Sequence, residues 1–163
     1  MKFALVLALA AASFASQLAQ AADTPEPPAP RAAVPAADKL ATARKLIEAR
    51  QWAAAIDELK RVDDRSSADW NNLMGYTARK TAVPDLAASE RYYEAALRID
   101  PHHRNTLEYS GELYLMKGDL PKAQARLGAL QGECGTSCSQ YADLKAAIER
   151  YKANGDKYVA SGW

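Results

Sequence analysis

A helical pattern repeated every 34 residues is the feature of the sequence that most constrains the fold. Segments 51–62, 85–96 and 119–130 align at this constant offset and share four columns. The columns read large, small, large and apolar: Trp52, Leu86 and Leu120; Ala55, Ser89 and Ala123; Leu59, Tyr93 and Leu127; Val62, Ala96 and Leu130. Steps of three and four residues place these side chains on one stripe of an α-helix. The period therefore predicts stacked helical units.

Each aligned segment is expected to be the second helix of a helical hairpin, because the small column lets a neighbouring backbone approach closely. The first helices are then expected at 38–49, about 68–80 and about 103–117. Two glycines fall on the packing faces of these first helices, Gly75 beside Trp70 and Gly111 beside Leu107. We interpret both glycines as packing residues.

This pattern resembles the tetratricopeptide repeat (TPR) family. The third copy carries the family pattern best, with Leu107, Gly111, Tyr114, Gly118, Leu120, Ala123, Leu127 and Leu130. The resemblance covers residues 38–131, as repeats at about 38–66, 67–100 and 101–131. The first copy departs from the pattern, with Ala43 and Arg50 where glycines are common. The resemblance implies an all-α solenoid of three helical hairpins.

Residues 132–163 are expected to form a Cys-x3-Cys turn, a capping helix and a tail. A solenoid end exposes an apolar face and needs a cap with a polar outer side. Segment 139–153 fits this role, because Tyr141, Leu144, Ile148 and Tyr151 form an apolar stripe. The prediction is therefore an all-α, TPR-like solenoid of about seven helices. Tyr158 and Trp163 either fold back on the cap or fray.

The first 37 residues are expected to lie outside the folded domain. Residues 1–21 place one lysine before a short apolar run and end in Ala-Gln-Ala, which is typical of a secretory signal cleaved after Ala21. The run is too short for a membrane-spanning helix. Residues 22–37 form a Pro/Ala-rich linker. We therefore expect a periplasmic or secreted protein that has no stable membrane insertion after cleavage.

The charge of the chain gives no indication of a nucleic-acid partner. The formal net charge is +1, and cleavage after Ala21 removes Lys2 and leaves the mature chain neutral. A basic patch for nucleic acid or an anionic membrane surface is therefore not expected. The sequence has no nucleophile elbow and no glycine-rich phosphate loop. His102 and His103 are expected to be solvated turn residues, and we expect no enzyme activity, metal or cofactor.

The TPR resemblance implies a protein or peptide partner, bound on the concave face that the first helices line. In the second hairpin this face would present Asp69, Asn72, Tyr76, Arg79 and Lys80, and in the third Asn105, Glu108, Glu112, Leu115 and Met116. These residues form a partly basic half beside a half with acidic groups and two exposed apolar side chains, Leu115 and Met116. Alternatively, Arg79 and Lys80 belong to an ordinary solvated face at a helix C-terminus. The carboxylate clamp of chaperone-binding members is not matched, because Leu40 and Leu73 replace its polar residues.

Cys134 and Cys138 are the only cysteines, and three interpretations compete for them. Export favours a disulfide that would fix how the cap docks. A soft metal such as Cu(I) would bind thiolates but needs a further ligand. A redox pair would be favoured by the helix N-terminus that follows, because a helix N-terminus lowers the pKa of a nearby thiol. This segment also resembles small exported bacterial repeat proteins. We favour a binding scaffold with a Cys134–Cys138 disulfide, and the alternatives are a thiol-redox or copper-handling protein and a structural subunit of an envelope complex.

Overall fold

The structure, a computed structural model, describes residues 38–159, and within this range the chain forms seven α-helices and no strand. They are α1 (Ala41–Glu48), α2 (Trp52–Val62), α3 (Ala68–Lys80), α4 (Leu86–Ile99), α5 (Arg104–Met116), α6 (Leu120–Cys134) and α7 (Ser139–Ala153). The all-α class predicted from the repeat is therefore confirmed. The predicted signal sequence, the predicted linker and Trp163 lie outside the described residues.

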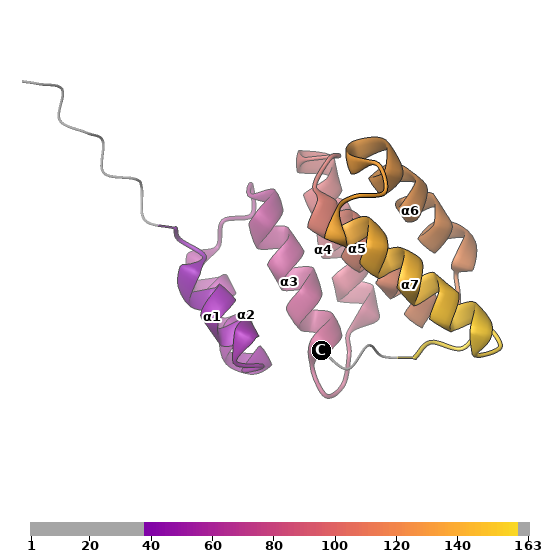
Figure 1. The fold of residues 1–163 in the computed structure, drawn as a ribbon. Helices are drawn as coiled ribbons and strands as arrows, with labels where there is room; N and C mark the ends of the chain where they lie inside the picture. Colours follow the sequence, from indigo (N-terminus) through magenta and orange to yellow (C-terminus); the bar gives the residue numbers. More distant parts are fainter. Residues whose placement is uncertain (1–37, 160–163) are drawn as a thin grey trace, which may run out of the picture. The chain divides into compact units, whose positions relative to one another are not determined.

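Each helix packs against the next one along the chain. Helices α1 and α2, α3 and α4, and α5 and α6 form three hairpins, and α7 packs against α6. Contacts also join α3 to α5 and α5 to α7, so α3, α5 and α7 form one row (Figure 1). This row contains the first helices of the second and third hairpins, followed by the capping helix.

The helix starts are encoded locally by side chains that accept hydrogen bonds from the first turn. The hydroxyl of Ser67 accepts from the backbone N–H of Trp70, at 3.2 Å. The carboxylates of Asp85 and Asp119 do the same at the starts of α4 and α6. Because the first four N–H groups of a helix have no partner inside it, these caps fix where α3, α4 and α6 begin.

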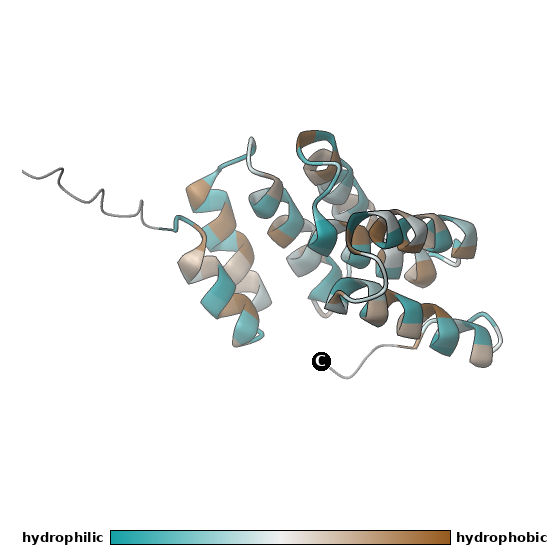
Figure 2. Ribbon diagram, turned by 45° about the horizontal axis from the view of Figure 1, so that its top comes forward, coloured by the Kyte–Doolittle hydropathy of each residue, from teal (hydrophilic) through white to brown (hydrophobic). Residues whose placement is uncertain are grey.

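The repeated columns are the packing surface of the solenoid. Of their members, Ala55, Leu59, Ser89, Tyr93, Ala96, Ala123 and Leu130 are buried. One hydrophobic cluster joins α1, α2 and α3, and a second joins α5, α6 and α7. Figure 2 shows hydrophobic and hydrophilic residues alternating along the helices, as expected for helices that bury one stripe. The period therefore sets which side chains form the core.

Gly75 lets α3 approach α4 closely, which leads to a first prediction. A Cβ atom on Gly75 would lie 2.7 Å from two ring atoms of Tyr93 and 3.1 Å from the carbonyl oxygen of Ser89. We expect Gly75→Ala to lower the free energy of unfolding by about 1–3 kcal/mol, because the two helices must move apart. This loss should outweigh the higher helix propensity of alanine.

Gly128 is the matched control for this substitution in denaturant unfolding. It also lies inside a helix, but a Cβ atom there would meet nothing within 4 Å. Gly128→Ala should therefore raise the free energy of unfolding by up to about 1 kcal/mol. Equal effects of the two substitutions would show that close packing of α3 on α4 is not required.

Candidate functional site

Five side chains of α3 and α5 meet on the row of first helices. Tyr76 and Arg79 come from α3, and Glu108, Tyr109 and Glu112 come from α5. Arg79 follows Tyr76 by three residues, and Glu112 follows Tyr109 by three and Glu108 by four, so the members from each helix share one side of that helix. We call these five residues the α3–α5 cluster.

Tyrosine rings form the apolar part of the α3–α5 cluster. The ring centroids of Tyr76 and Tyr109 lie 4.7 Å apart. The indole of Trp52, from α2, meets the Tyr76 ring edge-on, with centroids 6.1 Å apart. All three side chains are half-buried, so part of this aromatic surface is open to solvent. Aromatic surface of this kind binds apolar or aromatic side chains well.

A buried ion pair lies beside these rings. Arg79 Nη1 donates to Glu112 Oε2 at 2.7 Å, and the two side chains are 2% and 6% exposed. The guanidinium carbon of Arg79 lies 5.7 Å from the ring centroid of Tyr76 and 5.9 Å from that of Tyr109. Arg79 Nε and Nη2 are buried and make no hydrogen bond within the described part of the chain. The charges of Arg79 and Glu112 therefore cancel, and two N–H donors of Arg79 are left without an acceptor.

Glu108 adds an acceptor to the same site. Its side chain is buried, and its Oε1 has no hydrogen-bond partner among residues 38–159. Burial, followed by the negative charges of Glu112 and Asp143, raises the pKa of Glu108 to about 8. At neutral pH the side chain is therefore mainly a protonated acid, which can both donate and accept a hydrogen bond.

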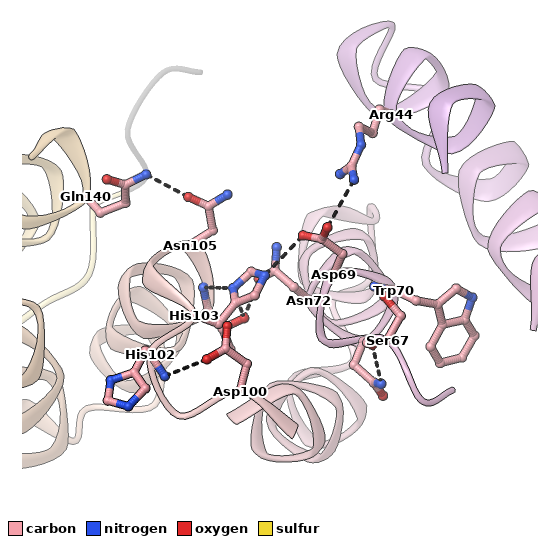
Figure 3. Close-up of polar contacts among 12 residues, drawn as sticks. Arg44, Ser67, Asp69, Trp70, Asn72, Asp100, His102, His103, Asn105 and Gln140 are labelled. Atoms are coloured by element: carbon pink, nitrogen blue, oxygen red, sulfur yellow. Dashed lines mark hydrogen bonds and ion pairs between the residues drawn. The ribbon is translucent and has the colours of Figure 1, made fainter. Parts of the chain in front are cut away.

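A polar network joins the N-terminal ends of consecutive first helices (Figure 3). The Oδ1 of Asp69 lies 3.1 Å from His103 Nε2, and its Oδ2 accepts from Arg44 at 3.3 Å. Farther along, the amide of Gln140 donates to Asn105 at 2.8 Å. These contacts connect α1, α3, α5 and α7, so they fix the register of the row.

The two histidines differ in their surroundings. His102 is exposed as expected, and its hydrogen bond to Glu133, at 2.6 Å, raises its pKa. The expectation that His103 is solvated is wrong. Its side chain is only 12% exposed, and its Nδ1 accepts from the backbone N–H of Thr106 at 3.1 Å. His103 is only partly exposed, because it caps α5 and also contacts Asp69 on the neighbouring helix.

The structure brings together part of the residue set predicted for the concave face. Tyr76, Arg79, Glu108 and Glu112 form most of the α3–α5 cluster, and Met116 Sδ lies 3.8 Å from Arg79 Nη1. Lys80 is half-buried, with its Nζ 5.6 Å from the Tyr76 ring centroid. The remaining polar residues lie nearer the N-terminal ends of the same helices: Asp69, Asn72 and Asn105.

Three details of the predicted face are wrong. Leu115 is 1% exposed and belongs to the core, because α5 is covered by α6 on one side and α7 on another. Arg79 is not solvated, and the basic and acidic halves are not separate, because Arg79 pairs with Glu112. Asn72 is buried, and its Oδ1 accepts from the Thr106 hydroxyl at 3.1 Å.

Two members of the aromatic surface were missed in the sequence. Tyr109 follows the predicted Glu108 directly, and its position is one short of a full 34-residue period after Tyr76. Trp52 belongs to the packing column of a second helix, yet its indole also contacts the Tyr76 ring. Adding the period to Tyr76 would have pointed to Tyr109 within one residue. No comparable signal pointed to Trp52.

The two cysteines lie at the joint between the last hairpin and the capping helix. Cys134 is the last residue of α6, and Cys138 is the N-cap of α7. Their Sγ atoms are in contact. In residues 38–159, no group of three His, Cys, Asp or Glu side chains could hold a metal ion, and none of the helices has the length and hydropathy to cross a membrane.

Three helical hairpins packed one after another are the architecture of a helical-repeat protein. Residues 84–148, from just before α4 into α7, match the family model described as tetratricopeptide repeat. This match identifies residues 84–148 as tetratricopeptide repeat, and such repeats generally mediate protein–protein interaction. No curated protein and no solved structure matches the chain.

Proposed function

We propose that this protein is an exported scaffold that binds an extended segment of a partner protein on the α3–α5 cluster, without catalysis. The observation that carries the proposal is the combination of half-exposed aromatic rings with buried polar atoms that have no partner in the described chain. Such a surface offers an apolar contact and hydrogen bonds at the same place, which is what an extended peptide requires.

The chemistry of the cluster matches a peptide backbone. Arg79 Nε and Nη2 can donate to peptide carbonyl groups, and Glu108 can accept from a peptide N–H or, when protonated, donate. The rings of Tyr76 and Tyr109 can cover an apolar side chain beside that backbone. Because Arg79 and Glu112 neutralise each other, the cluster favours a peptide segment without high net charge.

The proposal predicts that Tyr76→Ala lowers capture of the partner from periplasmic extract at least about tenfold, the effect expected of an aromatic anchor. Arg79→Ala is unsuitable for this test, because it would leave Glu112 buried without its partner. Tyr92→Ala is the matched control, because Tyr92 is a half-buried tyrosine on α4 whose ring meets Trp70 edge-on instead. Equal capture by the Tyr76 variant and the wild type would remove the α3–α5 cluster as the binding site.

We further propose that the mature protein begins at Ala22 and carries a Cys134–Cys138 disulfide. The signal-like first 21 residues support export, and an oxidising compartment favours the disulfide. The position of the cysteines at the α6–α7 joint supports a structural role, in which the bond fixes how α7 docks. Intact-mass measurement and thiol counting on protein from the periplasm test both points. An uncleaved chain would argue against export, and two free thiols would argue against the disulfide.

A further inference from the structure

Three half-buried aromatic rings from three helices lie next to one another beside the buried ion pair. The ring of Tyr76, on α3, lies in the middle, with its centroid 6.1 Å from that of Trp52 on α2 and 4.7 Å from that of Tyr109 on α5. We call these three residues the aromatic strip. The planes of neighbouring rings differ by 68° and 41°, so no ring covers its neighbour as in flat stacking. The strip therefore offers apolar surface from three helices at one place.

The polar atoms of the aromatic strip are hydrogen-bond donors without partners. The indole N–H of Trp52 and the hydroxyl groups of Tyr76 and Tyr109 make no hydrogen bond among residues 38–159. Burial raises the pKa of both tyrosine hydroxyls, so each keeps its proton at neutral pH and can donate. Arg79, beside the two tyrosine rings, adds two N–H donors that have no acceptor.

Strong acceptors are scarce at the same place. Of the two carboxyl groups in the α3–α5 cluster, that of Glu112 accepts from Arg79. The other belongs to Glu108, whose pKa of about 8 keeps it mainly protonated at neutral pH. An ordinary extended backbone alternates N–H donors with carbonyl acceptors, so many of its N–H groups would find no acceptor here. A segment that presents carbonyl groups and few N–H groups fits this surface better.

Proline meets this requirement, because its backbone nitrogen carries no hydrogen. Proline-rich segments form the polyproline II helix, which has no internal hydrogen bonds and leaves its carbonyl groups open to donors. This helix advances about 3.1 Å per residue, so rings 4.7 and 6.1 Å apart meet different residues of the segment. Grooves lined by aromatic side chains recognise segments in this conformation.

We propose that the partner supplies a proline-rich segment, which lies across the aromatic strip in the polyproline II conformation. This inference rests on the proposed function, and it names the chemical class of the segment that is bound. The aromatic rings pack against proline rings, and the donors beside them bind the carbonyl groups between the prolines. Because such a segment is already extended before it binds, it loses less conformational entropy than a flexible peptide.

Decaproline tests the proposal by NMR titration of the labelled, full mature chain. We expect its Kd to be at least about tenfold lower than that of a peptide of the same length with alternating serine and alanine, which has a full set of backbone N–H groups. The backbone amides of Trp52, Tyr76 and Tyr109 should shift when decaproline binds.

Tyr109→Phe separates hydrogen bonding from packing, because it keeps the ring and removes only the hydroxyl donor. It should raise the Kd for decaproline about three- to tenfold, the effect of losing one hydrogen bond. Tyr92→Phe removes a hydroxyl from the half-buried tyrosine on α4 and should leave this Kd unchanged.

The chain has five prolines of its own in residues 22–37. Replacing these five by serine should leave the Kd for decaproline unchanged, because we place a segment of another protein on the strip. A gain in affinity of about tenfold or more would show that the chain's own prolines compete for the strip, and would overturn a partner protein as the source of the segment.

The proline-rich partner is overturned if the alternating peptide binds as tightly as decaproline, or if decaproline shifts none of the three amides of the strip. Either result accompanied by Tyr76-dependent capture of a partner would leave the proposed function intact and remove only the proline-rich class. Loss of Tyr76 dependence as well would remove both.

Discussion

Replacing Arg79 by alanine is expected to lower the free energy of unfolding by about 3–5 kcal/mol, because it leaves Glu112 buried without its partner. Both side chains are almost fully buried, and they join α3 to α5 through a 2.7 Å hydrogen bond. Denaturant unfolding followed by circular dichroism measures the change. Arg91→Ala is the control, because Arg91 is an exposed arginine on the neighbouring helix α4.

The double substitution Arg79→Met with Glu112→Leu separates the loss of a charge partner from the loss of side-chain volume. Apolar residues of similar volume often replace a buried ion pair with little loss or even a gain in stability. We therefore expect the double variant to be clearly more stable than Arg79→Ala. An Arg79→Ala chain that unfolds like the Arg91→Ala control would contradict a buried, paired Arg79.

Replacing Glu108 by glutamine should remove a large pH dependence of stability. The folded state keeps the Glu108 proton up to a pKa of about 8, whereas the unfolded chain loses it near the ordinary value of 4.5. Between these values the unfolded state binds fewer protons, so the contribution of Glu108 to stability falls as pH rises. The expected slope is about 1.4 kcal/mol per pH unit, and the contribution is fully present only below the unfolded-state pKa.

Denaturant unfolding at a series of pH values from about 5 to about 8 checks this prediction. The difference in stability between Glu108→Gln and the wild type should grow in favour of the variant as pH rises. Glu94→Gln, at an exposed position on α4, should leave the wild-type slope unchanged. Parallel curves for the wild type and Glu108→Gln would contradict a buried, protonated Glu108.

The sequence was sufficient to predict the helices because their packing stripes are local patterns. The expected first helix at 68–80 coincides with α3, and the expected capping helix at 139–153 coincides with α7. Gly75 and Gly111 pack as predicted, since a Cβ on either would press on a neighbouring helix. In each case the prediction depended on residues within about one helical turn, three or four positions away.

Local packing stripes could not predict which residues of the concave face are buried. Leu115 and Arg79 lie on first helices that contact helices on several sides, so a single-stripe pattern does not describe them. The repeat did contain a usable signal, because polar contacts between first helices join residues about one period apart. Asp69 contacts His103 at a separation of 34 residues, and Arg79 contacts Glu112 at 33. Tyr158, which packs against the cluster of α5, α6 and α7, lies outside the repeat, so the period gave no information about it.

Site-specific photocrosslinking tests directly whether the α3–α5 cluster holds the partner. Azidophenylalanine is close to tyrosine in size, so it can replace Tyr76 on the cluster or Tyr92 on α4 with little change in packing. On irradiation in periplasmic extract, we expect a protein adduct from position 76 and none from position 92. An adduct from position 92 alone, or from neither position, would contradict this assignment of the binding site.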